Sequence, residues 1–209
     1  SCFERMAEYG NSEYWEERYK KDTDSFDWFQ RYDGFKEYIE KHLKTTDQIL
    51  QIGCGNSRLA EEMYQAGFVH QTNIDISPVT IETMQKKYEK YAEVKWVVQD
   101  CEDLSAYADG FFDGCVDKAT MDSLLCGNNG VRKTSNYLKE VSRVLKPGGA
   151  LILISYAHAD WRLPYLEVPE LKWTVDHFEI AKPDLSLDGS GNLPEDNGFH
   201  HVYVCVKDA

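Results

Sequence analysis

From Gln48 to Val206, short apolar runs rich in β-branched residues alternate with longer stretches whose apolar positions recur at helical spacing. This alternation predicts repeated strand–helix units that build a mostly parallel sheet. The expected strands are Ile49–Ile52, Thr72–Ile76, Val94–Val98, Phe112–Asp117, Leu151–Tyr156, Trp173–Ile180 and His201–Val206. The pattern therefore predicts an α/β fold with a seven-stranded, mostly parallel sheet and helices on both faces.

Three of the stretches between these strands have the spacing of amphipathic helices, and they are Leu59–Ala66, Val79–Tyr91 and Tyr137–Leu145. Pro78 suits the first turn of the second helix, and Gly67 suits the end of the first. The segment Lys146–Gly149, with the sequence KPGG, is expected to stop the third helix.

Two regions depart from this alternation. Residues 1–45 hold many aromatic side chains among charged ones and are expected to form a helical extension before a sheet core of residues 46–209. Pro183–Gly198 is rich in Gly, Pro, Asp and Asn, which predicts an exposed connection between the last two strands. Because 209 residues fit one ordinary domain, we expect a single domain over residues 1–209.

Composition narrows the range of partners. A formal net charge of -13 repels phosphate backbones, which argues against nucleic-acid binding, and it attracts a basic protein partner. No run approaches the roughly 18 apolar residues of a membrane span, and the first residues lack a signal-peptide pattern, so we expect a soluble, cytoplasmic protein. The six cysteines are scattered, with no C-x-x-C pair and no His at zinc-ligand spacing, which predicts reduced thiols and no metal site.

The strongest local signal for a ligand is a glycine turn after the first strand. Ile52 leads into Gly53-Cys54-Gly55-Asn56, and a helix is expected to begin near Ser57. Glycines permit a tight turn and the close approach of a ligand, and a helix N-terminus favours an anionic group. Asp75, at the end of the next strand, has the separation expected of a carboxylate that binds ribose hydroxyls. A nucleoside ligand is therefore predicted.

The residues that follow the glycine turn indicate which type of nucleoside binds. Arg58 stands where the dinucleotide fingerprint has its third glycine, which argues against a dehydrogenase. The compact turn followed by Asn56 instead resembles motif I of the class I methyltransferases, which have a Rossmann-like fold and use S-adenosylmethionine. Val97–Cys101 resembles the strand end of that family in which an Asp and the next residue read adenine, here Asp100 and Cys101. The segment Leu145–Ile152 resembles the family's helix-to-strand turn.

A closer resemblance lies after the fourth strand. The segment Asp117–Asp122, DKATMD, resembles the D-K-G-T-L-D motif of the methyltransferase branch that modifies lysines, notably on translation elongation factor 1-alpha. Ala119 and Met121 depart from that motif. Glu13–Tyr19 and Phe26–Phe29 also resemble the branch, and the resemblance extends to Tyr156.

The resemblance implies a set of site residues. The implied cofactor-binding residues are Trp15, Tyr19 and Trp28 as an aromatic lid, Gly53, Gly55, Asn56, Asp75, Ile76, Asp100, Cys101 and Lys118. An ammonium such as that of Lys118 can pair with the methionine carboxylate. Asp117, Lys118 and Asp122 are the candidate catalytic residues. The carboxylates of Asp117 and Asp122 each either orient the acceptor lysine or serve only as a structural cap.

The acceptor stays open at this stage. The leading hypothesis is methylation of a lysine in a protein such as elongation factor 1-alpha, with S-adenosylhomocysteine as the product. Methylation of an N-terminal amine belongs to the same branch. A small-molecule methyltransferase and a non-enzymatic scaffold that binds S-adenosylmethionine are the alternatives, because the fold does not define the acceptor.

Overall fold

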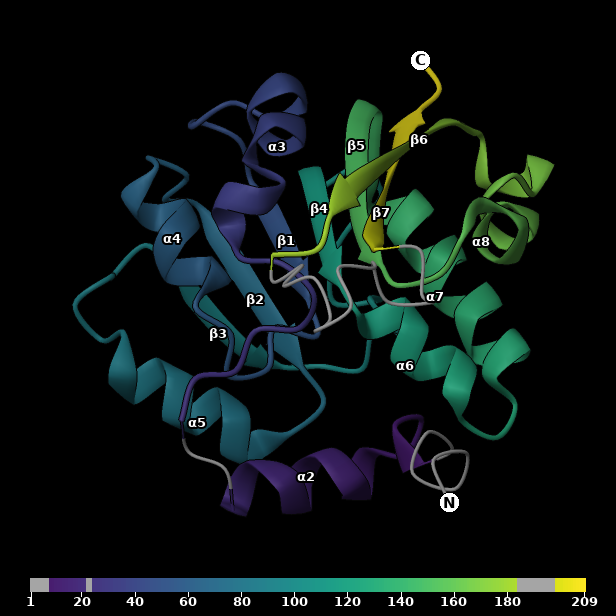
Figure 1. The fold of residues 1–209 in the computed structure, drawn as a ribbon. Coiled ribbons are helices and arrows are strands. Elements are labelled where there is room, and N and C mark those ends of the chain that lie inside the picture. Colours follow the sequence, from purple (N-terminus) through teal and green to yellow (C-terminus); the bar gives the residue numbers. More distant parts are fainter. Residues whose placement is uncertain (1–7, 22–23, 184–197) are drawn as a thin grey trace, which may run out of the picture.

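The computed structural model describes residues 8–21, 24–183 and 198–209. Within them a seven-stranded sheet has the order β3-β2-β1-β4-β5-β7-β6 (Figure 1). The strands are β1 (Ile49–Ile52), β2 (Gln71–Asp75), β3 (Lys95–Val98), β4 (Phe112–Lys118), β5 (Leu145–Ser155), β6 (Trp173–Ala181) and β7 (Phe199–Lys207). All pairs from β3 to β5 are parallel, and β7 runs antiparallel to both β5 and β6. The predicted α/β fold and its seven strands are confirmed.

The helices cover both faces of the sheet. They are α2 (Ser12–Lys21), α3 (Lys36–His42), α4 (Leu59–Gln65), α5 (Pro78–Lys87), α6 (Thr120–Cys126), α7 (Gly130–Val144) and α8 (Ala159–Leu166), with short 3-10 turns η1 (Tyr32–Gly34) and η2 (Pro169–Leu171). No helix in the described ranges is both long and apolar enough to cross a membrane.

Alternating side chains divide the core into two layers. Leu151 and Leu153 of β5 join the apolar cluster under α7, whereas Ile152 and Ile154 join the cluster under α3 and α4. Successive side chains of a strand point to opposite faces, so a central strand that is buried on both sides is apolar throughout. This is why the buried strands were visible in the sequence as continuous apolar runs.

The predicted helix boundaries are partly confirmed. Pro78 is the first residue of α5, where the Ser77 side chain accepts the Thr80 N–H, and Gly67 follows α4 with a φ of +97°. The third predicted helix is longer, because α7 begins at Gly130. The helix ends at Val144, just before the KPGG segment as predicted, but this segment already belongs to β5, which begins at Leu145.

Two helices were not predicted. The helix α6 follows Ala119, whose φ of +79° lies in the left-handed region, and α8 contains Pro164. The N-terminal extension does contain the predicted helix, α2, which packs against α5 (Figure 1). Most of the predicted Pro183–Gly198 connection lies outside the described residues.

The strand order fixes where a ligand can bind. From β1 the chain proceeds outward to β2 and β3, and then crosses to the other side of β1 to form β4 and β5. The connections therefore diverge between β1 and β4, and open α/β sheets bind ligands beside the carboxyl ends of strands at such a point.

Candidate cofactor-binding and active site

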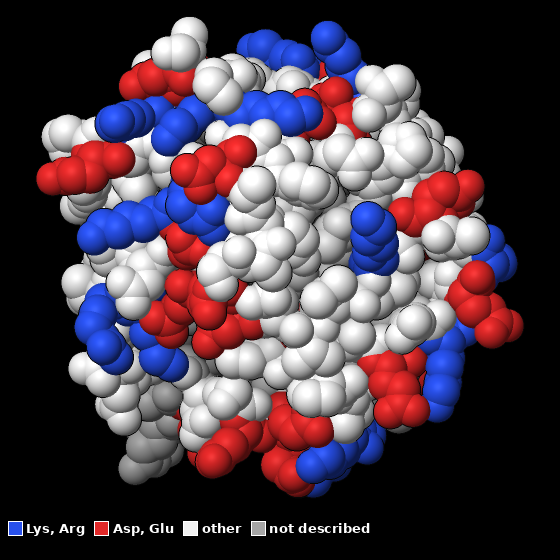
Figure 2. All heavy atoms as spheres, turned by 180° about the vertical axis from the view of Figure 1, so that it is seen from behind, with Lys and Arg blue, Asp and Glu red and all other residues white. Residues whose placement is uncertain are grey.

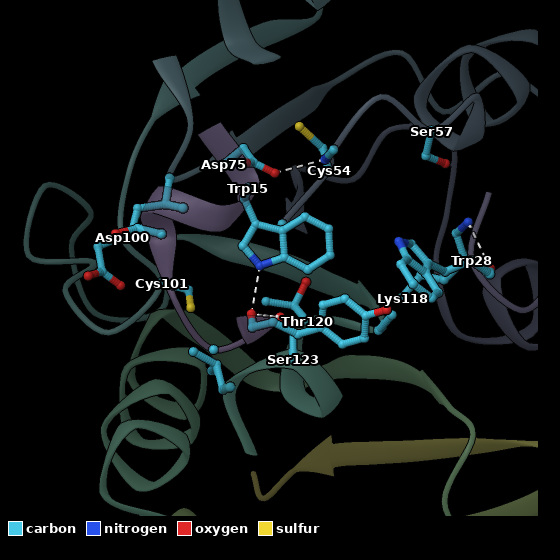
Figure 3. A pocket seen from close by; sticks show the side chains of 18 of the residues that line it. Trp15, Trp28, Cys54, Ser57, Asp75, Asp100, Cys101, Lys118, Thr120 and Ser123 are labelled. Atoms are coloured by element: carbon cyan, nitrogen blue, oxygen red, sulfur yellow. Dashed lines mark hydrogen bonds between the residues drawn. The ribbon is translucent and has the colours of Figure 1, made fainter. Parts of the chain in front are cut away.

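A cavity of about 240 Å³ opens at the carboxyl ends of β1 to β4 (Figure 3). Its walls include every residue predicted to bind the cofactor: Trp15, Tyr19, Trp28, Gly53, Gly55, Asn56, Asp75, Ile76, Asp100, Cys101 and Lys118. The structure thus brings together six separate sequence segments on one cavity. The individual binding roles of these residues stay predictions.

The glycine turn forms the floor of the cavity. Gly53 has a φ of +60° and Gly55 a φ of +51°, both in the region that glycine adopts without strain. A Cβ atom on Gly55 would lie 2.6 Å from the Tyr19 hydroxyl oxygen, and one on Gly53 would overlap with Thr120 Oγ1. Side chains at these positions would therefore fill the space above the turn.

Asp75, the last residue of β2, holds the glycine turn in place through hydrogen bonds to the backbone. Its Oδ2 atom accepts the Gly55 N–H at 2.8 Å, and its Oδ1 atom accepts the Ser77 N–H at 3.0 Å. Burial raises the pKa of Asp75, and these backbone hydrogen bonds oppose that shift. Each carboxylate oxygen has a second acceptor position, so Asp75 can still accept a ligand hydroxyl.

Asp100 and Cys101 form the wall that follows β3. Asp100 is exposed, and its Oδ1 atom accepts the Glu102 N–H at 2.9 Å. Cys101 is buried, and burial raises the pKa of its thiol well above the ordinary value. A neutral thiol is a poor nucleophile, so Cys101 serves as an apolar surface here.

The N-terminal extension supplies an aromatic roof, formed by Trp15, Tyr19 and Trp28. Trp15 stacks on Tyr19 with ring centroids 5.8 Å apart, and the ring of Trp28 stands edge-on to Trp15 at 6.3 Å. The Trp15 Nε1–H donates to the Tyr9 carbonyl at 2.6 Å, which fixes the indole. The Arg18 guanidinium lies 5.2 Å from the centroid of the Trp28 ring and adds a cation–π contact to the roof.

The Trp15 indole lies over the middle of the cavity. In the view of Figure 3 it stands between Asp75 and Asp100 on one side and Lys118 on the other. The roof therefore faces both the acidic side of the cavity and the end of β4.

Lys118 pairs with a carboxylate of the chain itself. Its Nζ atom donates to Asp27 Oδ1 at 2.8 Å and to the Trp28 carbonyl at 3.1 Å, and the expected pairing with the methionine carboxylate stays a prediction. Burial alone would raise the pKa of Asp27, but the Lys118 ammonium and the Ser57 hydroxyl hold it below its ordinary value. The charge of Lys118 therefore anchors the N-terminal segment beside the cavity.

Asp117 lies outside the cavity lining. Its carboxylate accepts the N–H groups of Thr120 and Met121 at 2.7 and 3.0 Å and the hydroxyl of Tyr137 at 2.6 Å. Burial raises the pKa of Asp117 to about 7. The side chain is fully buried at the start of α6, so the geometry supports the structural cap and not the catalytic alternative.

Asp122 is also absent from the cavity lining. Its Oδ1 atom accepts two N–H groups of Arg162, at 3.0 and 2.6 Å, and the Ser155 hydroxyl at 2.6 Å. Its Oδ2 atom accepts the Tyr156 N–H at 3.1 Å. All these partners belong to the β5–α8 region, so the geometry supports a structural role for this carboxylate as well.

Sequence reasoning missed several residues of the site. Asp27 lies inside the aromatic segment Phe26–Phe29. The resemblance drew attention to this segment, but nothing in it indicated that Asp27 pairs with Lys118. Thr120 lies inside DKATMD, lines the cavity and donates its hydroxyl to the Ile52 carbonyl at 2.9 Å. Ser123 and Lys133 also line the cavity, and no local motif pointed to them.

The cavity fits an adenosine with an attached sulfonium. The positive-φ glycines leave the floor open, two aspartates face the cavity from the ends of β2 and β3, and aromatic rings cover it. Carboxylates match hydroxyl and amine donors, and π faces favour a positive sulfur.

Comparisons with known proteins agree with this arrangement. Residues 50–153 match the methyltransferase domain family. The chain is 33% identical over 215 residues to the EEF1A lysine methyltransferase 4 of Mus musculus, covering 98% of this chain and 78% of that protein. It is 34% identical to the mouse eEF1A lysine and N-terminal methyltransferase, covering 82% of this chain and 24% of that protein.

A solved structure shows the same fold. The SAM-dependent methyltransferase from Methanosarcina mazei superposes with a TM-score of 0.62 at 19% identity, covering 88% of this chain and 99% of that chain. Fold, cavity and relatives lead to one assignment. The chain belongs to the S-adenosylmethionine-dependent methyltransferase family that contains the EEF1A lysine methyltransferases.

Proposed function

We propose that this enzyme transfers a methyl group from S-adenosylmethionine to the side-chain amine of a lysine in a protein, with elongation factor 1-alpha as the first substrate to test. The observation that carries the proposal is that the whole described cavity, including its aromatic N-terminal roof, lies within the stretch that aligns with an EEF1A lysine methyltransferase.

S-adenosylmethionine supplies the activated methyl group on its sulfonium. The residues of the chain have to hold that donor, exclude water and admit a neutral amine in line with it. In this proposal Asp75 binds the ribose hydroxyls and Asp100 the adenine, while the aromatic roof closes the cavity against solvent. Asp117 and Asp122 hold α6 and the β5–α8 turn in place and take no proton.

The acceptor amine has to lose a proton before it can attack. An unperturbed lysine has a pKa of about 10.4, and burial beside a positive sulfonium lowers it. Exclusion of water by the aromatic roof contributes to that burial. The enzyme therefore needs no protein nucleophile of its own.

Charge supports a protein substrate without specifying it. The net charge of -13 favours the approach of a basic protein surface. Figure 2 shows acidic and basic side chains interspersed over the rear face, around an extended uncharged area. Long-range attraction therefore comes from the overall charge and not from one acidic patch on that face.

The test is incubation of the full chain with labelled S-adenosylmethionine and elongation factor 1-alpha, followed by mass spectrometry of the product. We expect label on a lysine side chain. Label on an N-terminal amine would support the activity named for the second mouse relative. Normal binding of S-adenosylhomocysteine without label on any lysine would contradict the proposal.

Two glycine variants provide matched controls. Gly55→Ala places a Cβ 2.6 Å from the Tyr19 hydroxyl and should abolish most label transfer. Gly148→Ala imposes similar backbone strain at a φ of +77°, but no atom lies within 4 Å of its Cβ. Transfer by Gly148→Ala should match that of the original chain, so a loss confined to Gly55→Ala identifies the cavity as the site.

A further inference from the structure

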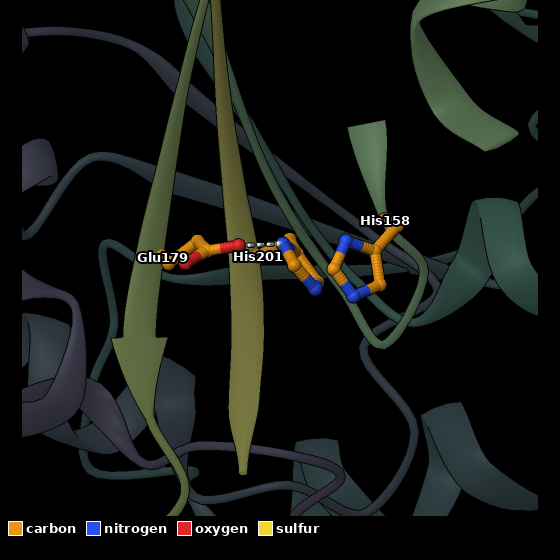
Figure 4. Close-up of side chains that lie close together, drawn as sticks. All are labelled: His158, Glu179 and His201. Atoms are coloured by element: carbon orange, nitrogen blue, oxygen red, sulfur yellow. Dashed lines mark ion pairs between the residues drawn. The ribbon is translucent and has the colours of Figure 1, made fainter. Parts of the chain in front are cut away.

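Three of the six histidines gather outside the cofactor cavity, on the face of the sheet that α8 covers. His201 of β7 lies directly across the ladder from Glu179 of β6, and His177 is the diagonal neighbour. His158 occupies the N-cap position of α8, and its ring centroid is 4.5 Å from that of His201. Figure 4 shows the His201 ring between Glu179 and His158.

The possible ligand atoms of His158, Glu179 and His201 all lie within 4.8 Å of one another. Glu179 approaches the Nδ1 side of the His201 ring, at 3.9 Å, so its side chain has to turn toward Nε2 to join an ion bound there. Donors around a tetrahedral zinc ion, at bond lengths of about 2.0 to 2.1 Å, are roughly 3.3 Å apart. His158 and Glu179 are exposed, so both side chains have room to turn toward one ion.

A second observation concerns the buried member of the set. His201 is 0% exposed, and its Nε2 atom has no hydrogen-bond partner among the described residues. A buried polar atom without a partner costs free energy, and a bound ion would supply the missing partner.

We propose that His158, Glu179 and His201 form a binding site for a divalent transition-metal ion of the zinc type. Two imidazoles and one carboxylate are a known zinc ligand set that leaves a fourth position for water. His177 Nε2 lies 3.0 Å from His201 Nδ1, so it can orient the His201 ring as an outer partner does in metal sites. The bound ion would join the turn after β5 to the β6–β7 ladder.

Sequence rules based on ligand spacing could not predict this site. Its ligands are contributed by a loop and two strands at positions 158, 179 and 201, whereas motif-based zinc prediction relies on closely spaced pairs. The sequence prediction of no metal site rested on such pairs alone. None of the three residues lines the cofactor cavity, so the ion would hold structure and take no part in methyl transfer.

The test uses the full chain after treatment with a chelator. Zn²⁺ is titrated by calorimetry, and Co²⁺ is titrated while its visible absorption is recorded. We expect one equivalent of each ion to bind, a rise in the thermal unfolding midpoint, and cobalt bands without thiolate charge transfer. Thiolate bands would assign the ion to a cysteine such as the partly exposed Cys126 and overturn the proposal.

Variants at the two exposed ligands distinguish Zn²⁺ binding at the proposed site from binding elsewhere on the chain. Glu179→Gln removes the anionic oxygen with little change in shape, and His158→Ala removes an imidazole. Each should weaken Zn²⁺ binding by at least about tenfold. The control His70→Ala removes an exposed histidine outside the cluster and should leave affinity unchanged.

Equal Zn²⁺ affinity in all variants, or the absence of saturable binding to the original chain, would refute the site. Each variant should still bind S-adenosylhomocysteine, because the cluster lies outside the cavity. Failure of the metal proposal is therefore distinguishable from failure of the proposed methyltransferase function.

Discussion

The DKATMD segment contributes to two buried ion pairs that differ in what they connect. Lys118 pairs with Asp27 and so ties the N-terminal segment to the edge of the cofactor cavity. Four residues later, Asp122 pairs with Arg162 and ties α6 to α8, outside the cavity lining. The side chains of both pairs are largely buried, at 4% and 13% exposure in the first and 4% and 6% in the second.

The comparison shows that proximity to a motif does not make a charged residue part of the active site. What decides its role is the element from which its partner comes. Asp27 belongs to the segment that carries the aromatic roof, so loss of the first pair should affect both stability and cofactor binding. Arg162 belongs to α8, so loss of the second pair should affect stability alone.

Arg162→Met gives the largest expected effect. The substitution leaves the buried Asp122 carboxylate without its cation, which typically costs about 3 to 5 kcal/mol of unfolding free energy. We expect the urea midpoint to fall with an unchanged slope, while the folded protein keeps its affinity for S-adenosylhomocysteine. Lys86→Met breaks the exposed pair with Glu82 and should leave the midpoint unchanged. A fall in cofactor affinity for Arg162→Met would show that the two regions are coupled.

Asp27→Asn should have the second largest effect. It leaves the Lys118 ammonium without an anion and weakens hydrogen bonds to charged groups, which are worth roughly 1.5 to 3 kcal/mol each. Stability and affinity for S-adenosylhomocysteine should both fall, as measured by urea unfolding and calorimetry. Asp24→Asn removes an exposed charge from the same segment and should change neither. Lost stability with unchanged affinity would separate this pair from the cavity.

Asp100→Ala should act on binding alone. Asp100 is exposed and its carboxylate makes one backbone hydrogen bond, so the fold should tolerate its loss. If Asp100 accepts a hydrogen bond from adenine, calorimetry should show S-adenosylhomocysteine affinity reduced by roughly ten- to a hundredfold, equivalent to about 1 to 3 kcal/mol. The control is Asp103→Ala, because Asp103 is exposed nearby and does not line the cavity. Equal affinity in both variants would remove Asp100 from the site.

Local patterns predicted the sheet and the cavity walls, because both depend on short segments. A buried strand is apolar along its whole length, and a glycine turn or a strand-end acid occupies adjacent positions in the chain. Every predicted cofactor-binding residue consequently lines one cavity. Two short helices were missed because their starts and interiors lack the usual signals: α6 follows β4 after a single left-handed residue, Ala119, and α8 contains a proline.

Side-chain pairing could not be predicted in the same way. Asp27 and Lys118 are 91 residues apart, and Asp122 and Arg162 are 40 residues apart. Only the folded topology brings each pair together, so the sequence did not indicate Asp27 as a partner of Lys118 and left both the catalytic and the structural role open for Asp117 and Asp122. The histidine cluster was missed for the same reason.

Ala119→Gly should give the smallest effect, and it tests the junction between the two ion pairs. Ala119 has a φ of +79°, where a residue with a Cβ is strained by about 1 to 2 kcal/mol, and the related motif has glycine at this position. Glycine relieves the strain but gains conformational entropy in the unfolded chain, worth roughly 0.5 to 1 kcal/mol. We expect a net stabilisation of about 1 kcal/mol or less in urea unfolding, with unchanged affinity for S-adenosylhomocysteine. The control is Ala157→Gly, at a buried alanine whose φ is not positive, and this change should destabilise the protein. Destabilisation by Ala119→Gly would mean that packing of the Ala119 methyl group outweighs the backbone strain.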